Sequence, residues 1–149
     1  MLDHAGIALC IPHKGAMCLL DAVVDWSKTA IFCRAFSHTD PGNPLRAEGR
    51  LGAANGIEYA AQAMAVHGAL LAASSDVPRQ GYLASVRGVQ LHVARLDDLP
   101  GELNITAERL SGDGNHVLYQ FALGHAGGCL LEGRATVVLD AEFRQETSI

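Results

Sequence analysis

Residues 56–73 read GIEYAAQAMAVHGALLAA, and the rest of the chain is organised around this stretch. Alanine is frequent, proline is absent and apolar side chains occur all round, which predicts one long helix. Such a helix must be covered on several sides by other elements. Glu58, Gln62 and His67 interrupt its apolar character, so we expect a core helix rather than a membrane span. A glutamate near the start of a core helix needs an explanation.

The segments on either side of this helix alternate apolar and polar residues and are bounded by glycine, proline or aspartate, as β-strands are. Two of them precede the helix and four follow it. They span residues 17–26, 29–37, 81–97, 101–112, 115–125 and 128–140. Short connections between consecutive strands favour antiparallel pairing. We therefore predict a single α+β domain over residues 1–149, in which a curved, mainly antiparallel sheet of about six strands wraps one central helix.

The composition excludes several classes of protein. The net charge is −5 and no cluster of lysine and arginine is present, which argues against a nucleic-acid partner. Only 18% of the residues are charged, which favours an oligomer that hides part of the surface. The four cysteines form no CxxC pair, and the N-terminus shows no secretory pattern. We expect a cytoplasmic protein with reduced thiols, no metal site and no membrane partner.

A long polar segment precedes the helix. It reads SHTDPGNPLRAEGRLGAANG at residues 37–56 and contains hardly any large apolar side chain. A segment of this length exceeds a simple connector, and long structured loops in compact domains are often functional. The sequence therefore predicts that this loop contributes to function.

Three motifs together resemble the 3-hydroxyacyl-acyl-carrier-protein dehydratases of the hotdog fold. The residues 11–14 (IPHK) and 19–21 (LLD) are similar to the family's LPHR-like element and the LLVDRV-like strand that follows it. Glu58 with Ala61 and Gln62 matches the motif on the family's central helix. The resemblance extends over Ile11 to Leu139, including the Pro–Gly turn at residues 100–101. The HFPG-like motif that usually supplies a second histidine upstream of the glutamate is missing, as in the divergent aryl-polyene branch that the chain most resembles.

The resemblance implies a lyase that dehydrates a 3-hydroxyacyl thioester on acyl carrier protein to the trans-2-enoyl thioester, in fatty-acid or polyene-type biosynthesis. A base removes the proton from C2, and an acid protonates the hydroxyl that leaves C3. Neither step requires a metal or a resident cofactor, because the carrier's phosphopantetheine holds the substrate. The implied partners are acyl carrier protein and a second hotdog subunit, in a homodimer or a heterodimer.

Glu58 is the candidate acid of this reaction. It lies near the start of the helix, and Gln62 follows one turn later on the same face, where its amide could orient Glu58 or the substrate hydroxyl. Asn55 and Gly56, at the helix start, are the other candidates for substrate binding, because free backbone N–H groups there can stabilise a developing oxyanion. The alternatives are structural: Glu58 stabilises the helix dipole, and Gln62 is a buried amide with its hydrogen bonds satisfied.

The base is less well defined, and the candidates are His13 and His38. His13 follows Pro12 in a constrained segment, where the family's histidine is usually regarded as structural. His38 lies at the mouth of the long loop, near the place of the missing histidine, but is equally typical of a turn. His67 points away from Glu58 by helical geometry. A further hypothesis is that the chain is one half of a heterodimer whose partner supplies the base.

Two other functions remain open. A hotdog acyl thioesterase also uses a carboxylate on this helix, since the fold does not fix the reaction. A subunit without a base could instead supply Glu58, or acyl binding alone, to a heterodimeric dehydratase. Four basic residues are candidates to contact an acidic carrier protein, with ordinary exposed charge as the alternative. These are Lys14, Arg46, Arg50 and Arg87.

Overall fold

The computed structural model describes residues 1–13, 15–73, 81–113 and 115–139. Its elements follow in chain order as β1 (Leu2–Asp3), α1 (His4–Cys10), β2 (Ala22–Trp26), β3 (Ala30–Ala35), α2 (Gly56–Ala73), β4 (Gly81–Leu91), β5 (Leu103–Gly112), β6 (His116–His125) and β7 (Gly128–Leu139). Short 3₁₀ turns lie at Gly15–Met17, Ser37–Thr39 and Ala53–Asn55. The long helix was predicted over the same residues that form α2.

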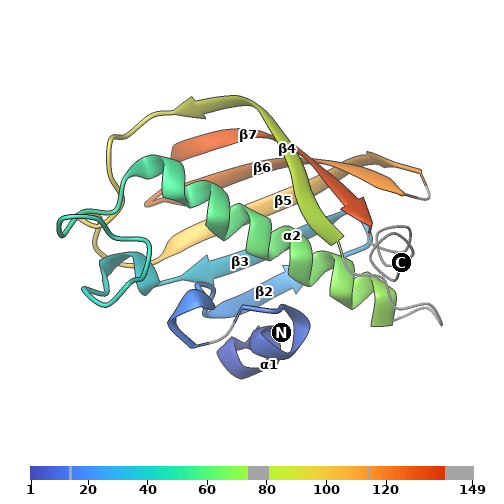
Figure 1. The fold of residues 1–149 in the computed structure, drawn as a ribbon, viewed down its shortest axis with the longest axis horizontal. Helices are drawn as coiled ribbons and strands as arrows, with labels where there is room; N and C mark the ends of the chain where they lie inside the picture. Colours follow the sequence, from blue (N-terminus) through green and yellow to red (C-terminus); the bar gives the residue numbers. More distant parts are fainter. Residues whose placement is uncertain (14, 74–80, 114, 140–149) are drawn as a thin grey trace, which may run out of the picture.

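The described strands form one seven-stranded sheet in the order β1-β2-β3-β5-β6-β7-β4, and every neighbouring pair is antiparallel. Helix α2 crosses one face of this sheet (Figure 1). Strand β4 is the outermost strand beyond β7, and its start curves toward the C-terminal half of α2. The predicted α+β architecture is confirmed. The sheet has one strand more than the predicted six because the two-residue β1 pairs with the start of β2.

The core lies between α2 and the concave side of the sheet. Burial alternates along β5 and β6, so every second side chain of these strands faces the helix. The helix presents small and medium side chains to the sheet, and these let it lie close to the strands. Its fully or almost fully buried residues include Tyr59, Ala60, Ala63, Met64 and Val66.

The first long strand is shorter than predicted. Strand β2 begins at Ala22, whereas residues 17–21 precede it in an irregular segment. Within this segment, the backbone N–H of Leu19 and the backbone C=O of Met17 bond to the side chain of Gln62 instead of to a neighbouring strand. Tertiary contacts with α2 thus replace the β-pairing that the apolar pattern predicted.

Strand β4 also ends earlier than the predicted residues 81–97. After His92, whose N–H still donates to Leu130 O of β7, the chain leaves the sheet, and residues 94–96 bond to the segment that precedes α2. The N–H of Leu96 donates to Leu51 O, and the N–H of Ala53 donates to Ala94 O. These bonds hold the end of the long loop against the chain that follows β4.

No helix among the described residues is long and apolar enough to cross a membrane.

Candidate active site

Glu58 lies in the first turn of α2, half-buried at the wall of a pocket of about 230 Å³. Among the described residues that line this pocket, His13 is the only other ionisable one, and the remaining lining is mostly aliphatic. It consists of Pro12, Ala61, Met64, Ala65, Leu83 and Val137. The pocket therefore joins the N-terminal segment, one face of α2, the edge strand β4 and its neighbour β7 around one carboxylate.

The carboxylate of Glu58 has no hydrogen bond or ion pair with any residue that the structure describes. In a pocket with mostly aliphatic walls, a carboxylate without a described partner is available to contact a ligand.

His13 lies between α1 and the turn at Gly15–Met17, directly after Pro12. It is half-buried, and its Nδ1 is inaccessible to solvent and has no hydrogen-bond partner among the residues that the structure describes. The structure thus brings two of the predicted residues, Glu58 and His13, to the same pocket.

His38 does not line this pocket. It is fully buried in the turn Ser37–Thr39, and its Nε2–H donates to Leu99 O at 2.8 Å. Its Nδ1 is buried and has no hydrogen-bond partner in the described part of the chain, and burial lowers the pKa of the ring. His38 therefore ties the long loop to the segment before β5 as a neutral imidazole, apart from Glu58.

Gln62 is fully buried and uses both ends of its amide within the chain. Its Oε1 accepts from the N–H of Leu19 at 2.9 Å, and its Nε2 donates to Met17 O at 2.7 Å. These contacts agree with the structural role considered for Gln62, that of a buried amide whose hydrogen bonds are satisfied within the chain. Gln62 fixes the N-terminal segment that carries His13 against the helix that carries Glu58.

Asn55 and Gly56 form the entry to α2. The Asn55 side chain donates to Gly52 O at 3.1 Å, and the N–H of Gly56 donates to the carbonyls of Ala53 and Ala54. The predicted free N–H at Gly56 is therefore occupied by the preceding turn. A Cβ on Gly56 would lie 2.6 Å from a methyl group of Leu131, so glycine here permits close packing of α2 on the sheet.

Tyr59 holds the long loop on the helix and was not singled out from the sequence. Its hydroxyl lies 2.8 Å from Ser37 Oγ and accepts from Asn43 Nδ2 at 3.1 Å. Ser37 donates to Leu19 O, so the Tyr59 hydroxyl donates to Ser37. Asn43 is itself buried and also donates to Ser37 O. One aromatic residue beside Glu58 thereby fixes both the loop and the N-terminal segment.

The walls at Leu83 and Val137 were also not predicted. They come from β4 and β7, which pair with each other, and both side chains face α2. Alternation along the strands indicates which side chains face inward, but it does not indicate which of them lie beside Glu58.

A long helix with a carboxylate in its first turn, wrapped by a single antiparallel sheet, defines a protein of the hotdog fold. Solved structures agree. One chain of the dehydratase heterocomplex ApeI:P from Xenorhabdus doucetiae matches with a TM-score of 0.82 at 22% identity, covering 100% of this chain and 99% of that one. The chain belongs to the ApeP-like family, whose model, described as ApeP dehydratase, matches residues 5–148. The predicted dehydratase family is thus confirmed, and the protein is an enzyme of the dehydratase type.

Thioesterases share the fold at lower similarity. A thioesterase from Haemophilus influenzae has a TM-score of 0.66 at 11% identity, covering 93% of this chain and 91% of that one. A hypothetical thioesterase from Streptococcus pneumoniae with coenzyme A has a TM-score of 0.56 at 12% identity, covering 79% and 84%. No curated protein sequence matches the chain. At these identities the likeness establishes the fold alone.

Proposed function

We propose that the chain dehydrates a 3-hydroxyacyl thioester held on acyl carrier protein, working together with a second hotdog subunit in a heterodimer. The observation that carries this proposal is the Glu58 carboxylate, which has no partner among the described residues and faces an apolar pocket. Aliphatic walls suit an acyl chain, and one exchangeable proton at the end of them suits the loss of a hydroxyl group.

In the proposed reaction the protonated form of Glu58 acts as general acid. A base takes the proton from C2, the C2–C3 double bond forms, and the C3 hydroxyl leaves as water with the proton that Glu58 donates. A positioned acid or base of this kind contributes about 10²–10⁴ in rate. Ala61, Met64 and Ala65 exclude water from the helix side of the pocket, so the acyl chain is held in an apolar environment.

The base comes from His13 or from the partner subunit. His13 lines the same pocket and has an unpartnered buried nitrogen, which supports a role for this chain's own histidine. Gln62 and Pro12 hold its segment in place, which equally supports a purely structural role. We favour a base from the partner, because the histidine of the HFPG-like motif is missing and His38 is engaged with Leu99.

The edge strand β4 supports the heterodimer. It has β7 on one side and no described strand on the other, and it runs over residues Gly81–Leu91. A long edge strand with apolar side chains is a template for pairing with another chain. Val86 and Val89 are half-buried, and Leu91 is exposed. Because Leu83 of β4 also lines the Glu58 pocket, a subunit that pairs with β4 would lie next to that pocket.

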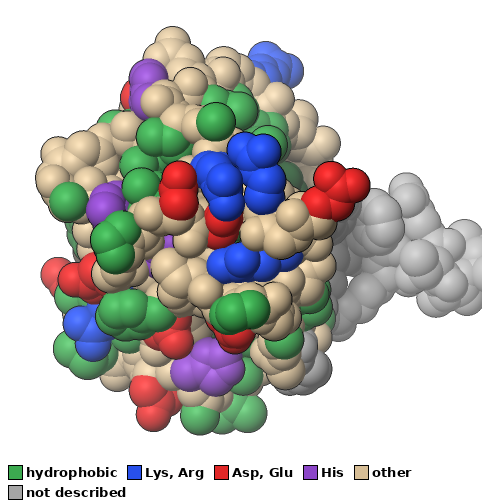
Figure 2. Space-filling model, turned by 90° about the vertical axis from the view of Figure 1, so that its left-hand side faces the viewer, with side chains coloured by type: hydrophobic (Ala, Val, Ile, Leu, Met, Phe, Trp, Pro, Cys, Tyr) green, Lys and Arg blue, Asp and Glu red, His purple; other side chains and the backbone are tan. Residues whose placement is uncertain are grey.

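Basic side chains support docking of an acidic carrier protein. Figure 2 shows lysine and arginine side chains gathered on the end of the molecule that carries the long loop. Arg50 is exposed, and its backbone bridges to that of Ala47. The backbone of Arg95, after β4, bridges to that of Gly52, but its guanidinium is paired with Asp97 and Asp98. Arg46 is engaged instead with the carbonyls of His38 and Gly49, and Lys14 lies outside the described residues. We propose that Arg50 meets the carrier. Arg87 on β4 instead lines a separate hollow with Asp113, His116 and Arg134.

The test compares two samples. One is the chain alone, and the other is the complex that the chain forms with a co-purifying hotdog subunit. Each sample receives a 3-hydroxyacyl carrier protein and a saturated acyl carrier protein, and mass spectrometry follows loss of water from the thioester. We expect the enoyl product from the complex and little from the chain alone. Robust dehydration by the chain alone, as a homodimer, would contradict the proposal that a second subunit is required. Release of free thiol from both substrates would show that the protein is a thioesterase instead.

A further inference from the structure

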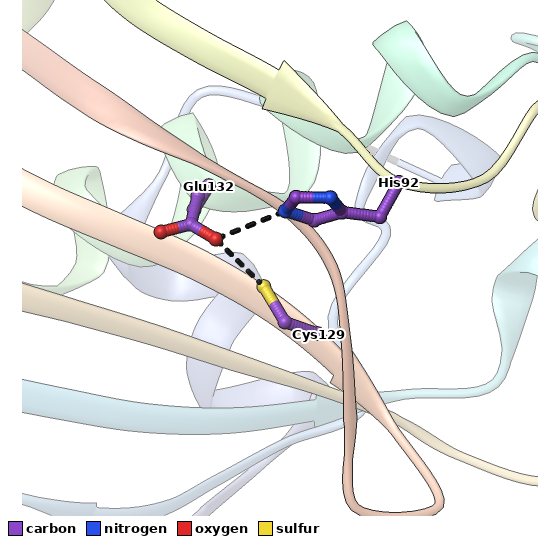
Figure 3. Close-up of side chains that lie close together, drawn as sticks. All are labelled: His92, Cys129 and Glu132. Atoms are coloured by element: carbon purple, nitrogen blue, oxygen red, sulfur yellow. Dashed lines mark hydrogen bonds and ion pairs between the residues drawn. The ribbon is translucent and has the colours of Figure 1, made fainter.

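Three potential metal ligands from two neighbouring strands meet at the surface, away from the Glu58 pocket. His92 follows the end of β4, and Cys129 and Glu132 belong to β7 (Figure 3). The ligand atoms of the three side chains all lie within 4.8 Å of one another. Within the described part of the chain, this is the one such grouping of three histidine, cysteine or acidic residues.

A β-bulge places Cys129 and Glu132 on the same face of the sheet. In a regular strand, residues three apart point to opposite faces. Here Leu131 pairs with Leu123, whereas Cys129 pairs with Gly124, so Leu130 is the extra residue. Leu130 and Leu131 are both buried, and the residues that flank them therefore point outward together. Bulges commonly re-aim a side chain in this way.

The same bulge fixes the position of His92. Leu91 pairs with Leu131, and the backbone N–H of His92 donates to Leu130 O at 2.8 Å. His92 is thus anchored to the residue that creates the bulge, although forty positions separate it from Glu132. Backbone hydrogen bonds, rather than mobile side chains, bring the three groups together.

We propose that His92, Cys129 and Glu132 bind a divalent metal ion of intermediate softness, for which Zn²⁺ is the model. Zinc accepts nitrogen, sulfur and carboxylate oxygen together, whereas Mg²⁺ and Ca²⁺ prefer oxygen alone. His92 Nε2 lies 3.0 Å from Glu132 Oε2, and Cys129 Sγ lies 3.4 Å from the same oxygen. Zinc bond lengths place neighbouring ligands of a tetrahedral site roughly 3.5 Å apart, so small side-chain rotations suffice.

Three protein ligands leave a fourth position open to water or a small ligand, which distinguishes this site from a closed structural site of four ligands. Without metal, Cys129 donates to Glu132, and both partial burial and this carboxylate raise the pKa of the thiol. A thiol in this state is a poor nucleophile, so the cluster is not built for thiol chemistry. Metal binding would displace the thiol proton.

The experiment uses the full-length chain without a histidine tag, first stripped of metal with a chelator. Titration with Co²⁺ is followed by absorption, because thiolate ligation produces a charge-transfer band. Zn²⁺ affinity is then measured by competition with a chromophoric chelator. We expect one ion per chain with a thiolate band, and each of Cys129→Ser, His92→Gln and Glu132→Gln should weaken Zn²⁺ binding by about tenfold or more.

Matched controls are Cys10→Ser, a half-buried cysteine of α1, and His116→Gln, an exposed histidine of β6. Both should bind like the wild type. Zn²⁺ should also raise the thermal midpoint of the wild type and of these controls, but not of Cys129→Ser. Circular dichroism establishes that each variant is folded. A cobalt complex without a thiolate band, or Zn²⁺ affinity unchanged in Cys129→Ser, would overturn the proposal.

Discussion

Helix α2 carries two kinds of polar side chain, and the contrast between them separates structure from function. Tyr59, Gln62 and His67 are fully buried, and each uses its polar atoms on partners within the chain. Glu58 is half-buried and has no partner among the described residues. A buried polar group without hydrogen bonds costs about 1–3 kcal/mol, so hydrogen bonds within the chain are required for Tyr59, Gln62 and His67. The fold supplies no such partner for Glu58 among the described residues.

Each of the three satisfied residues attaches a different segment to the helix. Gln62 holds the N-terminal segment, Tyr59 holds the long loop, and His67 bonds to Ser27 between β2 and β3 and to Tyr119 on β6. Of these attachments, the one made by Gln62 holds the segment that carries Pro12 and His13, and both of these residues line the pocket of Glu58. The comparison teaches that polar residues on a core helix are best sorted by whether the chain itself supplies their partners.

Glu58→Gln should produce the largest effect and tests this contrast directly. The amide keeps the size of the side chain but cannot donate an acidic proton. We expect dehydration by the complex to fall by about 10²–10⁴, the usual contribution of a positioned acid. The free energy of unfolding should change by no more than about 0.5 kcal/mol, because Glu58 bonds to no described residue.

The matched control for this variant is Glu108→Gln, an exposed carboxylate on β5. It should leave both activity and stability unchanged. Turnover is measured as enoyl formation, and stability by urea denaturation. If Glu58→Gln lost stability while the complex kept its activity, Glu58 would be a structural helix acid and the contrast along α2 would disappear.

Gln62→Met should show the opposite pattern. Methionine has a similar volume but leaves the N–H of Leu19 and the C=O of Met17 without their partners. We expect a loss of about 2–4 kcal/mol in the free energy of unfolding, from two unpaired buried backbone groups. Urea denaturation measures it. Unchanged stability combined with lost turnover would instead assign Gln62 to the substrate.

The sequence predicted the bounds of α2 because its composition, length and lack of proline agree with one another over many residues. It placed Glu58 near the start of this helix for the same reason. It could not predict the partners of Gln62, because Met17 and Leu19 lie in a segment whose apolar pattern is also that of a strand. Only the packing of that segment on α2 resolves the ambiguity.

The proposed metal site was not predicted, because the absence of a CxxC pair led us to expect none. The bulge at Leu130 aligns Cys129 with Glu132, and pairing of β4 with β7 adds His92. Both depend on strand register. Register is set by contacts between segments that are distant in the chain, so a pattern read along one segment does not reveal it.

The smallest expected effect is a dependence of stability on pH, which arises from the hydrogen-bonded histidine of α2, His67. His67 Nε2–H donates to Ser27 O, so its Nδ1 accepts from the Tyr119 hydroxyl at 2.6 Å. Burial raises the pKa of Tyr119 to about 12, which keeps that hydroxyl a donor at neutral pH. Burial also lowers the pKa of His67, and His38 is affected in the same way. Both rings are therefore neutral in the folded state.

Below about pH 6.5 the unfolded chain takes up protons at these two histidines more readily than the folded chain does. Stability is therefore complete above that pH and declines as the pH falls toward the lowered pKa values of the folded state. Urea denaturation between about pH 7.5 and about pH 5.5 should show this slope. His67→Gln should reduce this slope to the part that His38 contributes, whereas His116→Gln, at an exposed position, should keep it. An equal slope in both variants would mean that His67 is not the neutral, fully bonded group that distinguishes this side of α2 from Glu58.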